Sequence, residues 1–228
     1  MNEMCGRFTL TANVAEIIER FDIEAFLQED TYLPNYNVAP SQSVIAIINN
    51  GTINKMGYLK WGLIPPWAKE PSIGYKMINA RAETLTEKAS YRNAYKKKRC
   101  LIIADSFYEW KRIDQKTKTP MRIKLKSDSL FAMAGLWEQW KTPEGKAIFS
   151  CSVITTTANE LVKDIHDRMP AILRPEDEKI WLNTKITDTD YLNTLLKPFD
   201  NSLMEAYKVS SLVNSPKNNT IDLIQKIC

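Results

Sequence analysis

The sequence predicts an α+β fold: a single domain, residues 1–228, with a curved, mostly antiparallel and barrel-like β-sheet and flanking helices. Three observations lead to this expectation. A chain of 228 residues suits one domain with one core, and two domains at most. Apolar runs and alternating segments typical of strands fill the middle of the chain. Strand and helix patterns do not alternate regularly, which argues against a parallel doubly wound sheet.

The first predicted element is a helix, because apolar residues recur at helical spacing from Val14 to Phe21. Asn13 stands before them as an N-cap, and Glu16 is placed as its capping-box partner. Strands are expected at 44–48, 56–61, 100–104, 121–125, 130–136 and 148–155. Further helices are expected at 85–98, 160–165, 176–182, 191–196 and 221–227.

The composition is that of an ordinary globular protein, with 44% hydrophobic and 25% charged residues. A net charge of +4 permits a nucleic-acid partner without demanding one. Apolar runs such as residues 44–48 fall far short of the roughly 18 residues that span a bilayer, and the first ten residues lack the pattern of a signal peptide. A soluble, cytoplasmic protein without membrane contact is therefore expected.

The four cysteines lie far apart, at positions 5, 100, 151 and 228, and the chain has a single histidine. A zinc site would need these residues to converge from distant segments, so we expect no metal, and nothing indicates an organic cofactor. Disulfides are not expected in a cytoplasmic protein. At least one thiol is then available for chemistry.

Two loops, residues 34–40 and 61–67, hold aromatic and amide side chains between prolines. Rigid loops of this kind suit stacking on nucleic-acid bases, which contributes about 1 to 3 kcal/mol per base. The alternative is that Trp61 and Trp67 pack in the core, as tryptophans usually do.

Four segments carry side chains suited to catalysis: Cys5, Asn79 with Arg81, Glu109 between aromatic residues, and His166. Each has a structural alternative. The cysteine suits burial as a small apolar residue, the histidine suits an ordinary surface or core position, and the other groups suit turns and ion pairs. Composition alone does not show that the four segments meet.

Six motifs together resemble the SOS-response-associated peptidase (SRAP) family. They are Met-Cys-Gly-Arg-Phe at 4–8, Tyr-Asn-Val-Ala-Pro at 36–40, Trp-Gly-Leu-Ile-Pro at 61–65, Asn-Ala-Arg-Ala-Glu-Thr at 79–84, Phe-Tyr-Glu-Trp at 107–110 and His-Asp-Arg-Met-Pro at 166–170. The resemblance runs from residue 4 to about 175 and leaves the part from about 176 weakly anchored. It implies the SRAP fold.

The resemblance also implies a function: shielding abasic sites in single-stranded DNA through a covalent DNA–protein crosslink, as part of the response to DNA damage. An opened abasic sugar is an aldehyde, and an N-terminal cysteine is a 1,2-aminothiol that can form a Schiff base and then a thiazolidine. The α-amine titrates at about 7.7 to 8.0 and a thiol at about 8.5, so we expect both to be partly nucleophilic at neutral pH without large shifts.

In the family pattern Cys5, Asn79, Glu109 and His166 form the catalytic set. Glu109 would transfer protons, with its pKa raised by apolar neighbours. His166 would protonate the sugar ring oxygen, and Asn79 would orient the N-terminal amine and the open sugar. The expected DNA contacts are Arg7, Arg81 and Arg168 on phosphates, and Asn37, Trp67 and Thr157 from loop character and motif position.

Family membership also implies a peptidase step, removal of the residues before the cysteine by the same thiol and Glu109. Typical members begin Met-Cys, whereas here Asn2 and Glu3 precede Met4 and Cys5. Translation from Met4 needs only methionine removal, by a methionine aminopeptidase or by self-cleavage, and translation from Met1 needs loss of four residues. Either way we expect an active chain that begins at Cys5, with residues 1–4 removed.

Smaller departures from the family pattern are Ile103 and Ser106, where Pro and Gly are usual. Two other functions stay open: a cysteine peptidase acting on other proteins, and a non-covalent binder of single-stranded DNA. We expect a monomer that associates with the nucleoid after DNA damage.

Overall fold

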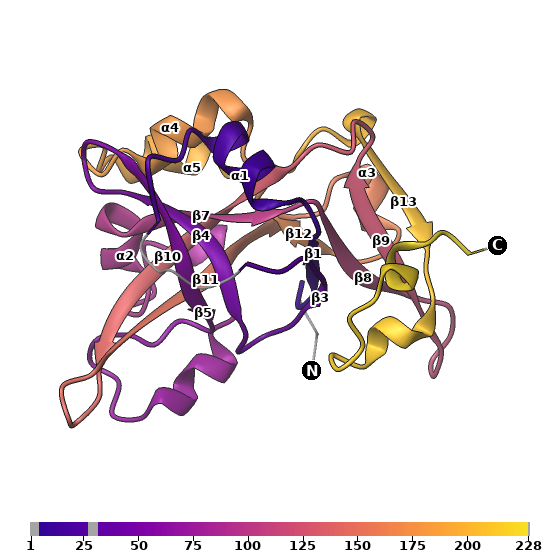
Figure 1. Ribbon diagram of the computed structural model, residues 1–228, viewed down its shortest axis with the longest axis horizontal. Helices are drawn as coiled ribbons and strands as arrows, with labels where there is room; N and C mark the ends of the chain where they lie inside the picture. The colour runs from indigo at the N-terminus through magenta and orange to yellow at the C-terminus, as the bar shows by residue number, and fades with distance from the viewer. Residues whose placement is uncertain (1–4, 27–31, 228) are drawn as a thin grey trace.

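The structure is a computed structural model that describes residues 5–26 and 32–227 (Figure 1). Its strands are β1 (Phe8–Leu10), β2 (Ala25–Phe26), β3 (Asn35–Val38), β4 (Ser43–Asn49), β5 (Asn54–Trp61), β6 (Asn79–Arg81), β7 (Arg99–Ala104), β8 (Ser106–Arg112), β9 (Lys118–Leu125), β10 (Phe131–Lys141), β11 (Ala147–Thr157), β12 (Arg168–Pro170) and β13 (Met204–Lys208). Its α-helices are α1 (Val14–Phe21), α2 (Arg92–Lys97), α3 (Glu160–Lys163), α4 (Pro175–Leu182) and α5 (Thr189–Thr194). Short 3-10 helices include η1 (Pro71–Lys76) and η5 (Ile221–Ile224).

Five strands close into a barrel in the order β11–β10–β7–β4–β5. All neighbours are antiparallel except the closing pair, where β5 runs parallel to β11 through Lys60 opposite Ser150 and Trp61 opposite Cys151. Helices α2 and α4 pack against β7 and β10. The fold is thus the predicted single α+β domain with a barrel-like, mostly antiparallel sheet.

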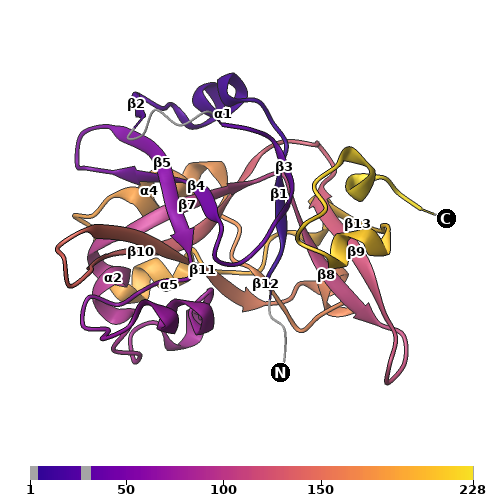
Figure 2. The same cartoon turned by 60° about the horizontal axis from the view of Figure 1, so that its bottom comes forward.

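A second sheet, in the order β13–β9–β8–β1–β3, lies beside the barrel (Figure 2). Strand β8 leaves β7 after one residue, Asp105, so one chain segment joins the two sheets. The C-terminal segment, yellow in Figure 2, covers β3 and β8 through buried Val213 and Leu223. Residues near the start of β1 therefore lie where the two sheets meet.

Local patterns predicted most of the elements. The six predicted strands correspond to β4, β5, β7, β9, β10 and β11, and the first helix has the expected capping box between Asn13 and Glu16. The predicted helix at 85–98 is wrong before residue 92. Thr and Ser residues in 84–90 favour turns over helix, and buried Leu85 and Tyr91 hold this stretch as 3-10 and turn structure.

Two further expectations need correction. The predicted helix at 221–227 is only a 3-10 turn, η5, because the chain then extends and Ile227 donates a backbone hydrogen bond to the Lys208 carbonyl. The predicted strands also omit the segment around Glu109, which forms the strand β8. Its successive side chains alternate between two buried faces, so it lacks the polar and apolar alternation by which half-buried strands are recognised.

None of the helices in the two described ranges has the length and apolar character that a bilayer-crossing helix needs.

Gly62 follows β5 and fixes the approach of η1 to the barrel. Its φ is +129°, and a Cβ there would lie 2.7 Å from the Gly74 carbonyl oxygen. We predict that Gly62→Ala lowers the free energy of unfolding by about 2 kcal/mol or more, from backbone strain plus this clash. Gly51→Ala is the matched control, because Gly51 also has positive φ, +98°, but open space around its Cβ position. If urea denaturation shows the same loss in the free energy of unfolding for both variants, the role of the contact between Gly62 and Gly74 is contradicted.

Candidate active site

Cys5 lies just before β1 and is buried, with 4% of its surface exposed. Its Sγ donates to the Arg168 carbonyl oxygen at 3.7 Å. Burial raises the pKa of the Cys5 thiol well above its ordinary value, and the nearby Glu109 carboxylate raises it further. The expectation of a thiol that is partly ionised at neutral pH without a large shift is therefore wrong. The thiol needs a proton acceptor when it reacts.

Glu109 projects from β8 toward Cys5, with only 2% of its surface exposed. Burial raises the pKa of its carboxyl to about 8, although interactions with the thiol and backbone N–H of Cys5 oppose the shift. At neutral pH most of this carboxyl is protonated. Its Oε1 has no hydrogen-bond partner among the described residues. The predicted rise in pKa from an apolar environment is confirmed, and the group can serve as an acid as well as a base.

Asn79 begins β6, which pairs in parallel with β11. Its side chain is buried, and Nδ2 donates to the Cys5 carbonyl oxygen at 3.0 Å. This bond fixes the backbone of Cys5 relative to the barrel.

His166 lies between α3 and β12, with its side chain 16% exposed. The Arg168 backbone N–H donates to His166 Nδ1 at 3.0 Å. The Arg168 carbonyl oxygen and the Asp167 carboxylate also lie near Nδ1, at 3.3 and 3.2 Å, so this nitrogen is engaged within the protein. The backbone of Arg168 links two site residues, because its carbonyl accepts from Cys5 and its N–H donates to His166 Nδ1.

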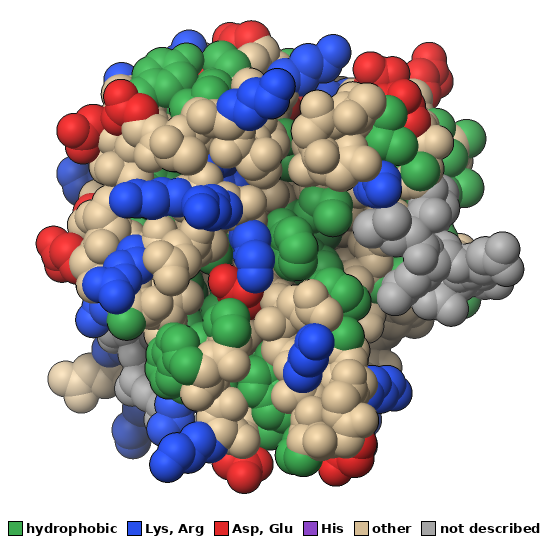
Figure 3. Space-filling model, turned by 90° about the vertical axis from the view of Figure 1, so that its left-hand side faces the viewer, with side chains coloured by type: hydrophobic (Ala, Val, Ile, Leu, Met, Phe, Trp, Pro, Cys, Tyr) green, Lys and Arg blue, Asp and Glu red, His purple; other side chains and the backbone are tan. Residues whose placement is uncertain are grey.

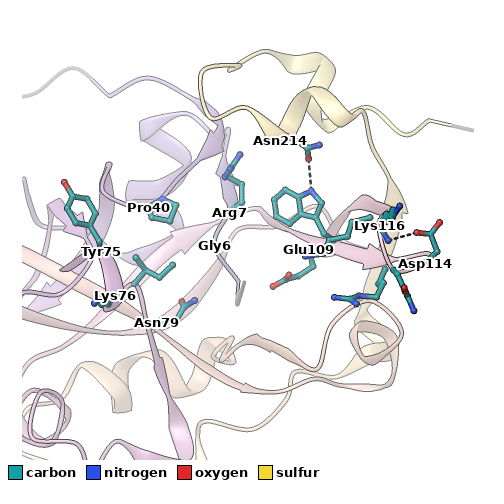
Figure 4. Close-up of a pocket in the computed structure, with 15 residues that line it drawn as sticks. Gly6, Arg7, Pro40, Tyr75, Lys76, Asn79, Glu109, Asp114, Lys116 and Asn214 are labelled. Atoms are coloured by element: carbon teal, nitrogen blue, oxygen red, sulfur yellow. Dashed lines mark hydrogen bonds between the residues drawn. The ribbon is translucent and has the colours of Figure 1, made fainter. Parts of the chain in front are cut away.

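Asn79 and Glu109 thus both interact with Cys5, and His166, from a fourth segment, is linked to Cys5 through the Arg168 backbone. A cleft of about 850 Å³ opens beside them, and Asn79 and Glu109 contribute to its wall (Figure 4). Five basic and two acidic side chains line it: Arg7, Lys76, Arg112, Lys116, Lys118, Glu109 and Asp114. With Glu109 mostly protonated, the cleft is strongly positive and suits a polyanion.

Basic side chains also occur away from the cleft, such as the exposed Lys96 and Lys97 on α2. Figure 3 views the molecule from the left-hand side of Figure 1 and shows Lys and Arg side chains interspersed with hydrophobic ones. Positive charge alone therefore does not mark the site. What distinguishes the cleft is that its charge adjoins the Cys5 and Glu109 pair.

Three of the six predicted DNA contacts have their polar groups engaged within the protein. Arg7 Nη1 donates to Asn37 Oδ1 at 2.7 Å and to the Val213 carbonyl at 2.6 Å. Arg168 is buried and forms a two-pronged ion pair with Glu83, at 2.6 and 2.9 Å. The remaining three, Trp67, Arg81 and Thr157, have exposed side chains, and Trp67 is 60% exposed.

Asn37 contacts the C-terminal segment rather than the cleft. Its Nδ2 lies within hydrogen-bond distance of three backbone carbonyls, those of Val213, Ser215 and Asn218, at 2.8 to 3.3 Å. We predict that Asn37→Ala lowers the free energy of unfolding by about 2 kcal/mol or more, because one buried and two half-buried carbonyl groups lose their donor. A thermal melt measures this loss. A melting temperature equal to wild type with weakened DNA binding would instead indicate a direct DNA contact.

Sequence reasoning missed several residues at the cleft. They are Tyr75, Lys76, Arg112, Lys116, Lys118 and, behind Arg168, Glu83. Glu83 stood inside a recognised motif, yet nothing local indicated that its partner would be 85 residues away. The others lie on η1 or in the hairpin of β8 and β9, and the position of these segments relative to Cys5 depends on the whole fold.

Comparison with known proteins identifies the family of this chain. The model of the SOS response associated peptidase (SRAP) family matches residues 4–216. The chain is 64% identical over 222 residues to the abasic site processing protein YoqW of Bacillus subtilis (strain 168), which covers 97% of this chain and 99% of that protein. It is 33% identical to the abasic site processing protein HMCES of Xenopus tropicalis, over 87% of this chain and 68% of that protein.

A solved structure from Bacteroides thetaiotaomicron matches with a TM-score of 0.88 and 29% identity, covering 98% of this chain and all of that one. A second, from Bordetella bronchiseptica, matches in fold with a TM-score of 0.77 at 22% identity, covering 90% of this chain and 100% of that one. Fold, site and sequence lead to one conclusion: the chain belongs to the SOS response associated peptidase (SRAP) family.

Proposed function

We propose that this protein captures abasic sites in single-stranded DNA by forming a thiazolidine between Cys5 and the opened sugar. The observation that carries this proposal is the placement of Cys5 beside Glu109 and Asn79 at a basic cleft. The relatives' common name, abasic site processing protein, supports the same substrate.

The chemistry requires a free α-amine on Cys5. The amine nitrogen attacks the C1′ aldehyde to give a carbinolamine, which loses water to give an imine. The thiol sulfur then bonds to the same carbon, and its proton passes to the nitrogen. One water leaves overall, and both C1′–N and C1′–S bonds remain in the ring.

Glu109 is placed to serve each proton transfer. The backbone nitrogen of Cys5 already interacts with this carboxyl. Once that nitrogen is a free amine, Glu109 can take the proton of its ammonium form, return a proton to the departing hydroxyl of the carbinolamine, and accept the proton of the raised-pKa thiol. Asn79 holds the Cys5 carbonyl, so amine and thiol keep one orientation during these steps.

His166 acts as a hydrogen-bond donor. Contacts within the protein engage Nδ1, so we assign the donor role toward the sugar to Nε2–H. A donor at the ring oxygen favours opening of the closed abasic sugar to the reactive aldehyde. The exposed Arg81 is available for a neighbouring phosphate.

The active chain begins at Cys5 in this proposal. Met1 and Met4, the two candidate start residues, lie outside the described residues. Removal of what precedes Cys5 is a peptide hydrolysis that consumes one water, with the Cys5 thiol as nucleophile and Glu109 as its proton acceptor. The burial of the thiol fits cleavage of the chain's own N-terminal residues better than cleavage of other proteins.

The test uses protein whose mass shows a chain starting at Cys5 and a single-stranded oligonucleotide with one abasic site. We expect a band that survives denaturation, with the mass of protein plus oligonucleotide minus one water. Absence of this band from such protein would overturn the proposal. Retained affinity without the band would leave non-covalent strand binding as the function.

A further inference from the structure

The cleft has two chemically different ends. Figure 4 shows Pro40, Tyr75 and Lys76 at one end and Asp114 and Lys116 at the other, with Asn79 and Glu109 between them. A strand whose abasic sugar sits at Cys5 must leave the site toward both ends.

The first end, which we call the η1 arm, consists of Pro40, Tyr75, Lys76 and Ile78. The Tyr75 ring is 66% exposed although it borders the cleft. It is held by a rigid support, because Gly74 packs against Gly62 at a distance that excludes a side chain. An exposed aromatic ring on a fixed turn, with one neighbouring cation, is suited to stacking on a base.

The second end, which we call the hairpin arm, is the β8–β9 turn with Arg112, Asp114, Gln115, Lys116 and Lys118. Its three cations are exposed and outnumber the single carboxylate. The aromatic ring in the cleft wall before this turn, Trp110, is engaged within the protein, because its Nε1 donates to Asn214 Oδ1 at 2.7 Å and the Arg7 guanidinium lies over its ring, 5.7 Å from the centroid. Asp114 accepts from the backbone N–H groups of Lys116 and Thr117, so this carboxylate serves the turn itself. Flexible ammonium groups on a turn suit phosphates and carry no base recognition.

We propose that the protein holds the two flanks of its DNA strand by different chemistry: bases stack on Tyr75 along one flank, and phosphates alone are bound by the hairpin arm along the other. The inference rests on the proposed function, because it assumes a single strand across the cleft. It adds Tyr75, Lys116 and Lys118 to the binding residues and predicts that bases matter on one side of the lesion only.

The experiment uses a labelled strand of thymidines with a central tetrahydrofuran, a stable abasic analogue without an aldehyde. In two variants the bases on the 5′ or on the 3′ flank are replaced by further tetrahydrofurans, so the phosphates remain. Anisotropy titration should show affinity falling about tenfold for one variant and less than about twofold for the other. Equal losses for both variants would overturn the inference.

Tyr75→Ala should lower the affinity for the intact strand by a similar factor. It should not lower the affinity further for the strand whose sensitive flank already lacks bases, because both changes remove the same contact. Tyr75→Phe keeps the ring and should bind like wild type. Tyr191→Ala is the matched control, since Tyr191 is exposed on α5 and does not line the cleft. If Tyr75→Ala lowers the affinity by the same factor whether or not either flank carries bases, the stacking role is contradicted.

The hairpin arm has its own readout. Lys116→Gln and Lys118→Gln should each reduce the slope of log affinity against log salt by about 0.7, the value for one single-strand phosphate contact, whichever flank lacks bases. An unchanged slope would contradict their role. Crosslinking of the same protein to a strand with a true abasic site separates the two proposals. If the crosslink forms but removing the bases from either flank lowers the affinity equally, only this inference is refuted. If the crosslink does not form, the proposed function is refuted.

Discussion

Cys5→Ser is expected to abolish the adduct that survives denaturation. The variant must be produced as a chain that begins at residue 5, because without the thiol it does not remove the preceding residues. A serine at that N-terminus keeps the α-amine, so the imine with the abasic aldehyde still forms. The hydroxyl is a much poorer nucleophile than the thiol, so ring closure fails and the imine hydrolyses when the complex is denatured. Borohydride reduction before denaturation should therefore trap an adduct of the variant, and a denaturing gel without reduction should show none.

The matched control is Cys151→Ala. Cys151 is another free cysteine of the described residues and is fully buried in the core on β11. Its loss should cost stability but leave the adduct intact when the protein is folded. The serine hydroxyl can still donate to the Arg168 carbonyl, so Cys5→Ser should melt close to wild type. A heat-stable adduct formed by Cys5→Ser would contradict the thiazolidine.

The sequence predicted the individual barrel strands but not the strand pairing that closes the barrel. Apolar and alternating patterns indicated the barrel strands because each strand must bury at least one face locally. The closing pairs, Trp61 with Cys151 and Lys60 with Ser150, join segments about ninety residues apart, and no local pattern carries that information. Strand β8 escaped recognition because Phe107 and Tyr108 are buried on opposite faces.

The site was predictable in its reactive groups but not in its supporting contacts. Cys5, Asn79, Glu109 and His166 were singled out as residue types with chemistry, and the resemblance supplied their grouping. Arg168 was expected to bind phosphate, yet its guanidinium pairs with Glu83 while its backbone contacts Cys5 and His166. An arginine's partner depends on which segments the fold brings near, which the sequence alone does not give.

Glu109→Gln is expected to slow adduct formation by about 10²- to 10⁴-fold, the usual loss when a placed acid–base group is removed. Glutamine keeps the shape but can neither accept the amine proton nor return one to the carbinolamine. In wild type the amine and this carboxyl titrate as a coupled pair, so the rate should rise and then fall with pH. In the variant the rate should only rise with pH, as the amine loses its proton. A rate that still falls at high pH in the variant would show that another group causes the fall.

Glu138→Gln is the matched control for this loss. Glu138 is a buried carboxylate on β10 that pairs with Lys98 and does not line the cleft. The Glu138→Gln substitution should lower the free energy of unfolding and leave the rate of adduct formation per folded molecule unchanged.

The same Glu109→Gln substitution should stabilise the unprocessed chain. The carboxyl has a pKa of about 8 in the fold against about 4.3 when unfolded, so the folded state binds its proton more tightly. Between these two values the unfolded chain ionises while the folded one does not, and stability falls as pH rises. Glutamine removes this dependence. In a Cys5→Ala background, which blocks processing, the variant should therefore gain little at pH 4 and on the order of a few kcal/mol at pH 8, measured by urea denaturation.

In a chain that begins at Cys5, the gain should shrink, because the ammonium group of the new N-terminus faces Glu109 and favours its ionised form. The ionised Glu109 carboxyl, which destabilises the unprocessed fold, would then be stabilised by the ammonium group of Cys5. Equal gains for processed and unprocessed chains, compared by urea denaturation at pH 7, would show that amine and carboxyl do not interact, and would remove Glu109 as the group that activates the amine.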